Sequence, residues 1–148
     1  MAFRFALEAV LKFRRSRERA ERLKLEAIVA ERARTQAALR ELAEARSEWN
    51  RRFEEQLKTG AAGAELQWET LRQTNAKLAR SRLEARLEDC ERRREAQEQI
   101  FFGARREREV LDDLCLRQMR AYRMEEARQE QRELDELFLT RQRFSKAE

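Results

Sequence analysis

Lys58-Thr59-Gly60-Ala61-Ala62-Gly63-Ala64 is the stretch that decides the fold of this chain. It holds two of the three glycines among 148 residues, and proline is absent throughout. Glycine ends helices readily, because it has no side chain to clash in the left-handed backbone conformation. Since Gly60 and Gly63 lie between two segments with a helical pattern of apolar residues, we expect the chain to turn back at residues 58–64.

Composition favours helix on both sides of this turn. Charged residues make up 43% of the chain and hydrophobic residues 41%, and the dominant types, Arg, Glu, Ala and Leu, lose little conformational freedom in a helix. Disorder is the alternative for so polar a chain, but Leu, Trp and Phe recur at helical spacing, which argues against it. We therefore predict an all-α fold in a single domain spanning 1–148, with helices over about 3–57 and 65–143.

Each predicted helix carries a coiled-coil stripe, in which residues alternate three and four positions apart. The apolar members are Leu7, Leu11, Leu25, Ile28, Leu39, Leu42, Trp49 and Phe53 in the first helix, and Leu83, Leu87, Cys90, Phe101, Ala104, Leu111, Cys115 and Tyr122 in the second. Polar residues interrupt both stripes, namely Arg14, Glu18, Glu21, Arg32, Thr35, Arg46, Arg94, Gln97, Arg108 and Gln118. The pattern predicts an antiparallel coiled-coil hairpin with a weak seam, and it makes no strong case for a homo-oligomer.

The second helix is predicted to be the longer one. A turn near residue 61 sets Leu39 against Leu83 and Leu11 against Leu111, so that nothing lies opposite the chain beyond about residue 120, a length of about 36 Å. An isolated helix of that length is marginal in water. It nevertheless carries a set of apolar residues: Tyr122, Met124, Leu134, Leu137 and Phe138. We interpret this segment as a partner-binding end, with a frayed polar tail as the alternative.

All of the excess charge lies at the start of the chain. Residues 1–24 hold eight Lys or Arg and three Glu, a net of +5, whereas the remaining residues hold 26 charges of each sign. Helical spacing places Phe3, Leu7 and Leu11 on one side of an amphipathic basic helix. Such a helix can bind an acidic protein surface, an anionic membrane or nucleic acid. Interleaved glutamates and a seam that turns back on itself argue against nucleic acid.

No pattern in the chain indicates an active site. Histidine is absent, so the commonest general base near neutral pH and a common metal ligand are both missing. Cys90 and Cys115 are about 37 Å apart on one helix, too far for a disulfide, and are interpreted as reduced seam residues. The pair Asp112-Asp113 is of a kind more often solvated than metal-bound. We expect no enzyme activity, no cofactor and no metal, and the lack of a long apolar segment predicts a soluble cytoplasmic protein.

The two ends of the chain resemble the flagellar FliJ family. Phe3-Arg4-Phe5-Ala6-Leu7-Glu8-Ala9-Val10-Leu11-Lys12-Phe13-Arg14 looks like the opening of that family, and Glu130-Gln131-Arg132-Glu133-Leu134-Asp135-Glu136 resembles its C-terminal signature. The resemblance implies a non-enzymatic component of the flagellar type III protein export apparatus. It would be a central stalk that inserts into and stimulates a hexameric export ATPase and links it to the membrane export-gate protein, with export chaperones as further candidate partners. Its place would be the cytoplasmic face of the inner membrane at the flagellar base.

The same resemblance implies two binding surfaces. The paired chain ends enter the ATPase ring, and the candidate residues are Phe3, Leu7, Val10, Leu11, Arg14, Arg15, Leu134, Asp135, Glu136 and Phe138. The turn points toward the export gate, and the candidate residues there are Trp68, Leu71, Asn75 and Leu78. Asn75 interrupts this otherwise apolar strip. Three alternatives stay open: the equivalent stalk of an injectisome, a generic coiled-coil tether or chaperone, and a membrane-surface anchor.

Overall fold

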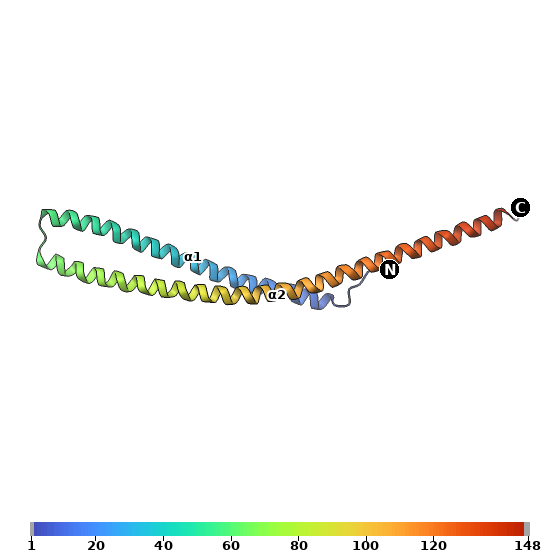
Figure 1. The fold of residues 1–148 in the computed structure, drawn as a ribbon, viewed down its shortest axis with the longest axis horizontal. Coiled ribbons are helices and arrows are strands. Elements are labelled where there is room, and N and C mark those ends of the chain that lie inside the picture. Colours follow the sequence, from blue (N-terminus) through green and yellow to red (C-terminus); the bar gives the residue numbers. More distant parts are fainter. Residues whose placement is uncertain (1, 147–148) are drawn as a thin grey trace. The chain divides into compact units, whose positions relative to one another are not determined.

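The computed structural model describes residues 2–146, which form two long helices and no strand (Figure 1). Helix α1 spans Glu8–Thr59, and helix α2 spans Gly63–Ser145. The two helices pack against each other in opposite directions, since Glu18 pairs with Arg108 and Trp49 pairs with Glu69. The predicted all-α antiparallel hairpin with a longer second helix is confirmed.

The turn between the helices uses a glycine where the backbone needs one. Gly60 has a φ of +97°, in the left-handed region that other residues rarely enter. Its N–H donates to the carbonyl of Leu57 at 3.4 Å, which closes the last turn of α1. On the other side, the N–H of Ala62 donates to the carboxylate of Glu65 at 3.3 Å and caps the start of α2.

Residues 2–7 are not helical, although the pattern predicted a helix from about residue 3. Helix α1 begins at Glu8, whose N–H donates to the carbonyl of Phe5 at 3.2 Å. The side chain of Phe5 is buried, and the ring of Phe3 lies 5.7 Å from that of Tyr122 in α2. Burying a Phe side chain is worth about 1.5–3 kcal/mol, whereas helix propensity contributes only tenths of a kcal/mol per residue. The free energy gained from the aromatic contacts therefore exceeds what another turn of helix would contribute.

The chain divides into two compact units, each described here by itself. The end unit comprises Met1–Arg19 and Gly103–Glu148, and the turn unit comprises Ala20–Phe102. Leu11 and Ala104 are buried in the end unit, while Cys90 is fully buried in the turn unit. Each of these three residues belongs to one of the predicted apolar stripes.

Two polar residues that interrupt the stripes, Gln97 and Arg32, contact polar groups of the other helix in the turn unit. Gln97 donates to the backbone carbonyl of Glu21 at 3.1 Å and to its carboxylate at 2.5 Å. Arg32 forms an ion pair with Glu91. A buried polar group costs free energy unless it finds a hydrogen-bond partner. Gln97 thus finds hydrogen-bond partners on the other helix, and Arg32 finds an opposite charge there.

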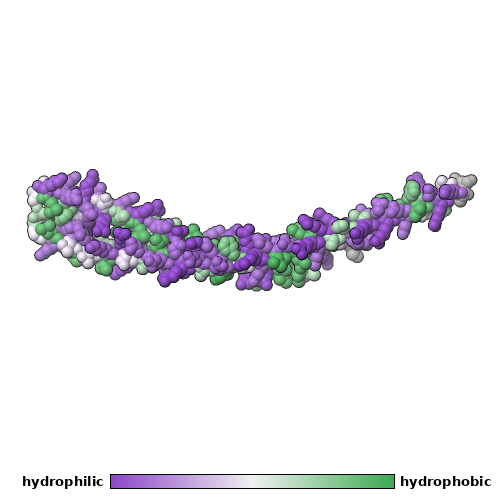
Figure 2. All heavy atoms as spheres, viewed as in Figure 1, coloured by the Kyte–Doolittle hydropathy of each residue, from purple (hydrophilic) through white to green (hydrophobic). Residues whose placement is uncertain are grey.

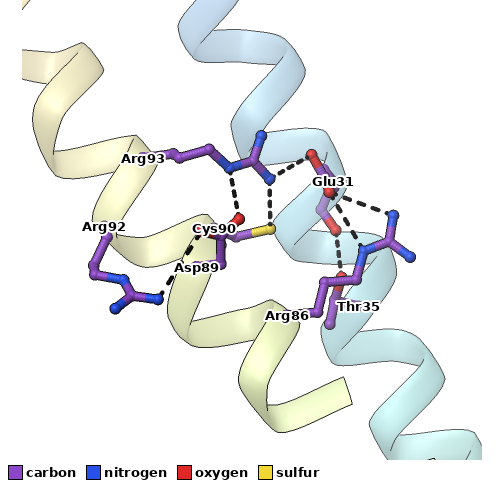
Figure 3. Close-up of polar contacts among 7 residues, drawn as sticks. All are labelled: Glu31, Thr35, Arg86, Asp89, Cys90, Arg92 and Arg93. Atoms are coloured by element: carbon purple, nitrogen blue, oxygen red, sulfur yellow. Dashed lines mark hydrogen bonds and ion pairs between the residues drawn. The ribbon is translucent and has the colours of Figure 1, made fainter. Parts of the chain in front are cut away.

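The fully buried thiol of Cys90 lies inside such a polar cluster (Figure 3). Arg93 donates to Glu31 of α1 at 2.8 Å, to Asp89 at 3.0 Å and to the sulfur of Cys90 at 3.4 Å. Arg86 approaches Glu31 from the other side at 3.3 Å. The hydrogen bond from Arg93 is the main reason why the pKa of Glu31 lies below its ordinary value. Cys90 and Cys115 are both free cysteines.

Helix α2 passes through Gly103 without interruption. A Cβ atom added at this glycine would meet no heavy atom within 4 Å. Close helix packing therefore does not require a glycine here. Neither helix of the described chain contains a segment long and apolar enough to cross a membrane.

Candidate protein-binding surfaces

The end of α2 is a helix with no buried side chain. We call residues 123–145 the terminal arm, and every one of them is exposed. Its large apolar residues have exposed fractions between 52% and 74%, and they are Met124, Leu134, Leu137, Phe138, Leu139 and Phe144. Figure 2 shows apolar surface among hydrophilic residues near this end of α2. Exposed apolar clusters on a polar background are typical of protein-binding sites.

Two ring-binding candidates of the arm, Asp135 and Glu136, accept hydrogen bonds from other residues of the same helix. The side-chain amide of Gln131 donates to Asp135 at 2.9 Å, and the hydroxyl of Thr140 donates to the backbone carbonyl of Glu136 at 2.8 Å. A side-chain pair such as that of Gln131 with Asp135 stabilises a helix by about 0.2–0.5 kcal/mol. It supports the arm as a helix while Leu134 and Phe138 remain exposed to solvent.

The four apolar candidates near the start of the chain fall into two groups. Leu11 is only 4% exposed, and Phe3 packs against Tyr122, so these two hold the end unit together. Leu7 and Val10 are about two-fifths exposed and remain accessible. We therefore assign Leu7 and Val10, rather than Leu11, to the accessible surface of this segment.

The two basic candidates are paired with carboxylates of α2. Arg14 forms an ion pair with Glu107, and Arg15 reaches Asp112 at 2.9 Å. Arg108 donates to Asp112 at 2.6 Å and to Glu18 at 2.5 Å. Arg14 and Arg15, two of the eight basic residues in residues 1–24, are therefore paired with acidic residues of α2.

These contacts change the proton affinity of Asp112. Burial by itself would raise the pKa of this carboxyl group, but hydrogen bonds from Arg108 and Arg15 outweigh it and hold the pKa below its ordinary value. The same cluster raises the pKa of Arg108, mainly through the hydrogen bond to Glu18. Both shifts favour the charged forms of Asp112 and Arg108.

The ten ring-binding candidates all lie in the end unit but not in one place. Phe3 lies beside Tyr122, whereas Leu134 follows Tyr122 by twelve residues, which is about 18 Å along a helix. The candidates thus form two patches on the end unit, one at the start of α1 and one on the terminal arm. The structure does not bring them together into a single patch.

The gate-binding candidates form a strip on one side of α2 in the turn unit. Trp68 is 72% exposed, while Leu71 and Leu78 are each about half exposed. Asn75 is exposed as well and continues the spacing of three and four residues that keeps the strip on one helix face. We call these four residues the tip strip. Figure 2 shows apolar surface gathered at the end of the turn unit that contains the turn.

A groove lies beside the tip strip and includes residues of α1 that the sequence analysis did not select as candidates. We call it the tip groove, and its lining residues are Trp49, Phe53, Gln56, Glu65, Trp68, Glu69 and Arg72. The stripe pattern predicted Trp49 as a seam residue, yet this side chain is 40% exposed. A sequence signal was present, because the only two tryptophans of the chain lie on opposite sides of the turn.

Glu69 lies at the centre of the contacts around this groove and is only 6% exposed. Its carboxylate accepts hydrogen bonds from the indole N–H of Trp49 at 2.5 Å, from Gln73 at 3.0 Å and from Arg72 at 3.3 Å. Burial would raise the pKa of Glu69, but hydrogen bonds from Arg72, Trp49 and Gln73 together lower it. The guanidinium of Arg72 also lies 4.1 Å from the centre of the Trp49 ring.

The surfaces described above are suited to binding other proteins. Among the residues that the structure describes, no group of three or more His, Cys, Asp or Glu side chains is placed to hold a metal ion. Arg15 and Arg72 are paired with neighbouring carboxylates, whereas large apolar side chains such as Trp68 and Phe138 are exposed. Aromatic residues with a polar surround are frequent anchors in protein interfaces.

Comparison with known proteins agrees with the resemblance of the chain ends. The family model described as flagellar FliJ protein matches residues 3–148. Neither the comparison with curated proteins nor that with solved structures finds a match. The family match covers both chain ends and the whole turn unit.

Proposed function

The chain belongs to the FliJ family of flagellar proteins, and on this premise we propose that it is the central stalk of the flagellar export ATPase. Membership in the family implies a non-catalytic component associated with the flagellar export machinery. Our proposal goes further. It states that the terminal arm inserts into a ring of six ATPase subunits, and that the tip strip contacts the membrane export-gate protein at the cytoplasmic face of the inner membrane.

The exposed terminal arm is the observation that supports this proposal most strongly. A helix of this length is marginal in water by itself, yet the arm presents Leu134, Leu137 and Phe138 with at least 60% of each side chain exposed. Burying one such side chain in a partner is worth about 1.5–3 kcal/mol. Insertion into a ring would cover these residues and stabilise the helix at the same time.

A stalk that supplies no catalytic group can still stimulate an ATPase. If the arm binds one conformation of the ring subunits more tightly than another, it shifts their equilibrium by the difference in binding free energy. Leu134 and Phe138 are the anchors that we assign to this contact, with Leu7 and Val10 as a second patch of the end unit. The arm would thereby favour the conformation in which the ATPase is most active.

The tip strip is the proposed contact with the export gate. Trp68 is the most exposed aromatic residue in the turn unit, and Leu71 and Leu78 extend the same helix face. Tryptophan is enriched among the residues that contribute most to protein interfaces. One chain would then contact the ATPase through its end unit and the gate through its turn unit.

The ring contact can be tested by replacing both anchors of the arm in one variant, Leu134→Asp with Phe138→Asp. We expect loss of ATPase stimulation with little change in helix content by circular dichroism, because neither side chain packs within the chain. The matched control, Gln129→Asp with Gln142→Asp, adds the same charges at exposed polar positions of the arm and should stimulate normally. Full stimulation by the anchor variant would refute ring insertion through the arm.

A further inference from the structure

We infer that Glu69 is a positioning residue of the gate-binding surface. It holds Trp49 and Arg72 so that the tip groove offers aromatic walls to an apolar side chain of the membrane export-gate protein. This inference rests on the proposed function, and it extends the gate contact from α2 to α1. Glu69 itself acts through Trp49 and needs no contact with the partner.

The first step of the argument is the burial of the Glu69 carboxylate. A charged group is costly to bury unless hydrogen bonds replace those of water, and Glu69 receives bonds from Trp49 of α1 and from Arg72 and Gln73 of α2. Charged acceptors make stronger hydrogen bonds than neutral ones. Glu69 therefore links the two helices at this point beside the turn.

The second step concerns the orientation of the Trp49 ring. Its N–H is held by Glu69, and Arg72 lies over the ring while donating to the same carboxylate. Two contacts that meet at one anion restrict the rotation of the indole more than either contact would alone. Without the carboxylate, Arg72 and the indole N–H would both lose their shared partner, and the ring would be free to turn.

The third step concerns which kind of side chain the tip groove can bind. The charged lining groups are already engaged, since Glu65 accepts from the N–H of Ala62 and Arg72 is paired with Glu69. The remaining lining residues are three aromatic side chains, Trp49, Phe53 and Trp68, and the uncharged Gln56. Such walls favour an apolar side chain, because a charged group would lose water without gaining a free partner.

The last step identifies the partner. Trp68 belongs to the tip strip and also lines the tip groove, so the groove continues the surface that we assign to the export gate. A protein that covers Trp68 from the strip side is in position to place a side chain between Trp68 and Trp49. The gate protein is therefore the occupant to which we commit.

Binding of the full chain to purified export-gate protein in detergent micelles tests this inference. Trp49→Phe keeps an aromatic ring but removes the N–H that Glu69 accepts, and Glu69→Ala removes the acceptor. We expect each variant to weaken binding about two- to tenfold, because the side chain at position 49 would then have to be ordered when the partner binds. Glu69→Gln keeps an oxygen for the indole and should restore part of the affinity. Glu84→Ala, which removes an exposed carboxylate paired only within α2, should bind as the unaltered chain does.

Tryptophan fluorescence, read together with circular dichroism, separates a local change at Trp49 from a general loss of structure. In a Trp68→Phe background, Trp49 is the only tryptophan, and Glu69→Ala should shift its emission to longer wavelength while circular dichroism keeps the helix content constant. Glu69→Gln should give a smaller shift. The emission of the Glu84→Ala control should not change.

Different results would refute different parts of the argument. If Trp49→Phe and Glu69→Ala bind the gate protein as tightly as the unaltered chain, Glu69 is not a positioning residue, although the gate contact stands. If the unaltered chain and Glu84→Ala do not bind the gate protein at all, the gate contact in the proposed function is wrong. An unchanged Trp49 emission in Glu69→Ala would also overturn the positioning role.

Discussion

Within the end unit, residues 8–19 of α1 pack against residues 103–122 of α2, and we call these residues the paired part. The paired part and the terminal arm are built from the same kinds of residues but use them differently. Leu11 is 4% exposed where α1 and α2 pack together, while Leu134 is 60% exposed on the arm. Arg108 donates hydrogen bonds to two carboxylates, one of them on the other helix, whereas Gln131 of the arm donates to Asp135 of its own helix. Residues of the paired part therefore serve stability, and those of the arm are available for a partner.

Replacing the two leucines by alanine tests this contrast most directly. We expect Leu11→Ala to lower the free energy of unfolding by about 2–5 kcal/mol, because it leaves a cavity in a packed site. Leu134→Ala should change it by less than about 0.5 kcal/mol, because the side chain is already exposed. Urea denaturation followed by circular dichroism gives both values. Similar losses for the two variants would show that the arm is covered within the chain.

Replacing Arg108, a polar residue between the paired helices, should give the next largest change in the free energy of unfolding. Arg108→Ala should lower the free energy of unfolding by about 1–3 kcal/mol, since Glu18 and Asp112 would each lose a charged hydrogen-bond partner. The control is Arg105→Ala, which removes an exposed pair with Glu109 on the same helix and should cost about 0.3–0.5 kcal/mol. If the two variants prove equally stable, the contact between Arg108 and Glu18 contributes little to the pairing of the helices.

Acid should weaken the paired part through Asp112. Because the pKa of Asp112 is lower in the folded chain, its contribution is present above the ordinary pKa near 4 and is lost as the pH falls through the lowered value. We expect at most about 1 kcal/mol from this group, since it is partly exposed. Urea denaturation between pH 7 and pH 3 should show a smaller loss of stability for Asp112→Asn than for the unaltered chain. Identical pH profiles would rule out this contribution.

Replacing Gly103 should give the smallest change in the free energy of unfolding, and it tests how closely the two helices approach in the paired part. It precedes the buried Ala104, yet a Cβ atom on it would meet open space. Gly103→Ala should therefore raise the free energy of unfolding by about 0.5–1 kcal/mol, because alanine is the better helix former. A loss of stability in thermal denaturation would instead indicate that the helices approach each other closely at this glycine.

The candidate surfaces could be predicted from the sequence only in part. Leu134 and Phe138 were expected to lack cover within the chain, and they are exposed. Leu11, by contrast, was both a stripe residue and a candidate for ring binding, and the structure shows it buried. Sequence spacing places a residue on a helix face but does not tell how deeply that face is covered. The binding roles of all these residues remain predictions.

The sequence by itself determined where the chain turns, that both arms are helical and that the second is the longer one. These features depend on local properties, namely the two glycines around residues 60–63, the absence of proline and the spacing of apolar residues. Local preference acts over a few residues, so it can be read directly from the chain.

Only the tertiary structure decided which residues meet across the two helices. It folds Phe3 and Phe5 into a non-helical start, joins Gln97 to Glu21, and brings Trp49 of α1 to Glu69 of α2. These contacts depend on the alignment of two segments that are far apart in sequence, and a shift of one residue would replace every pair. Packing and the need to satisfy buried polar groups select that alignment, and neither is a property of one segment alone.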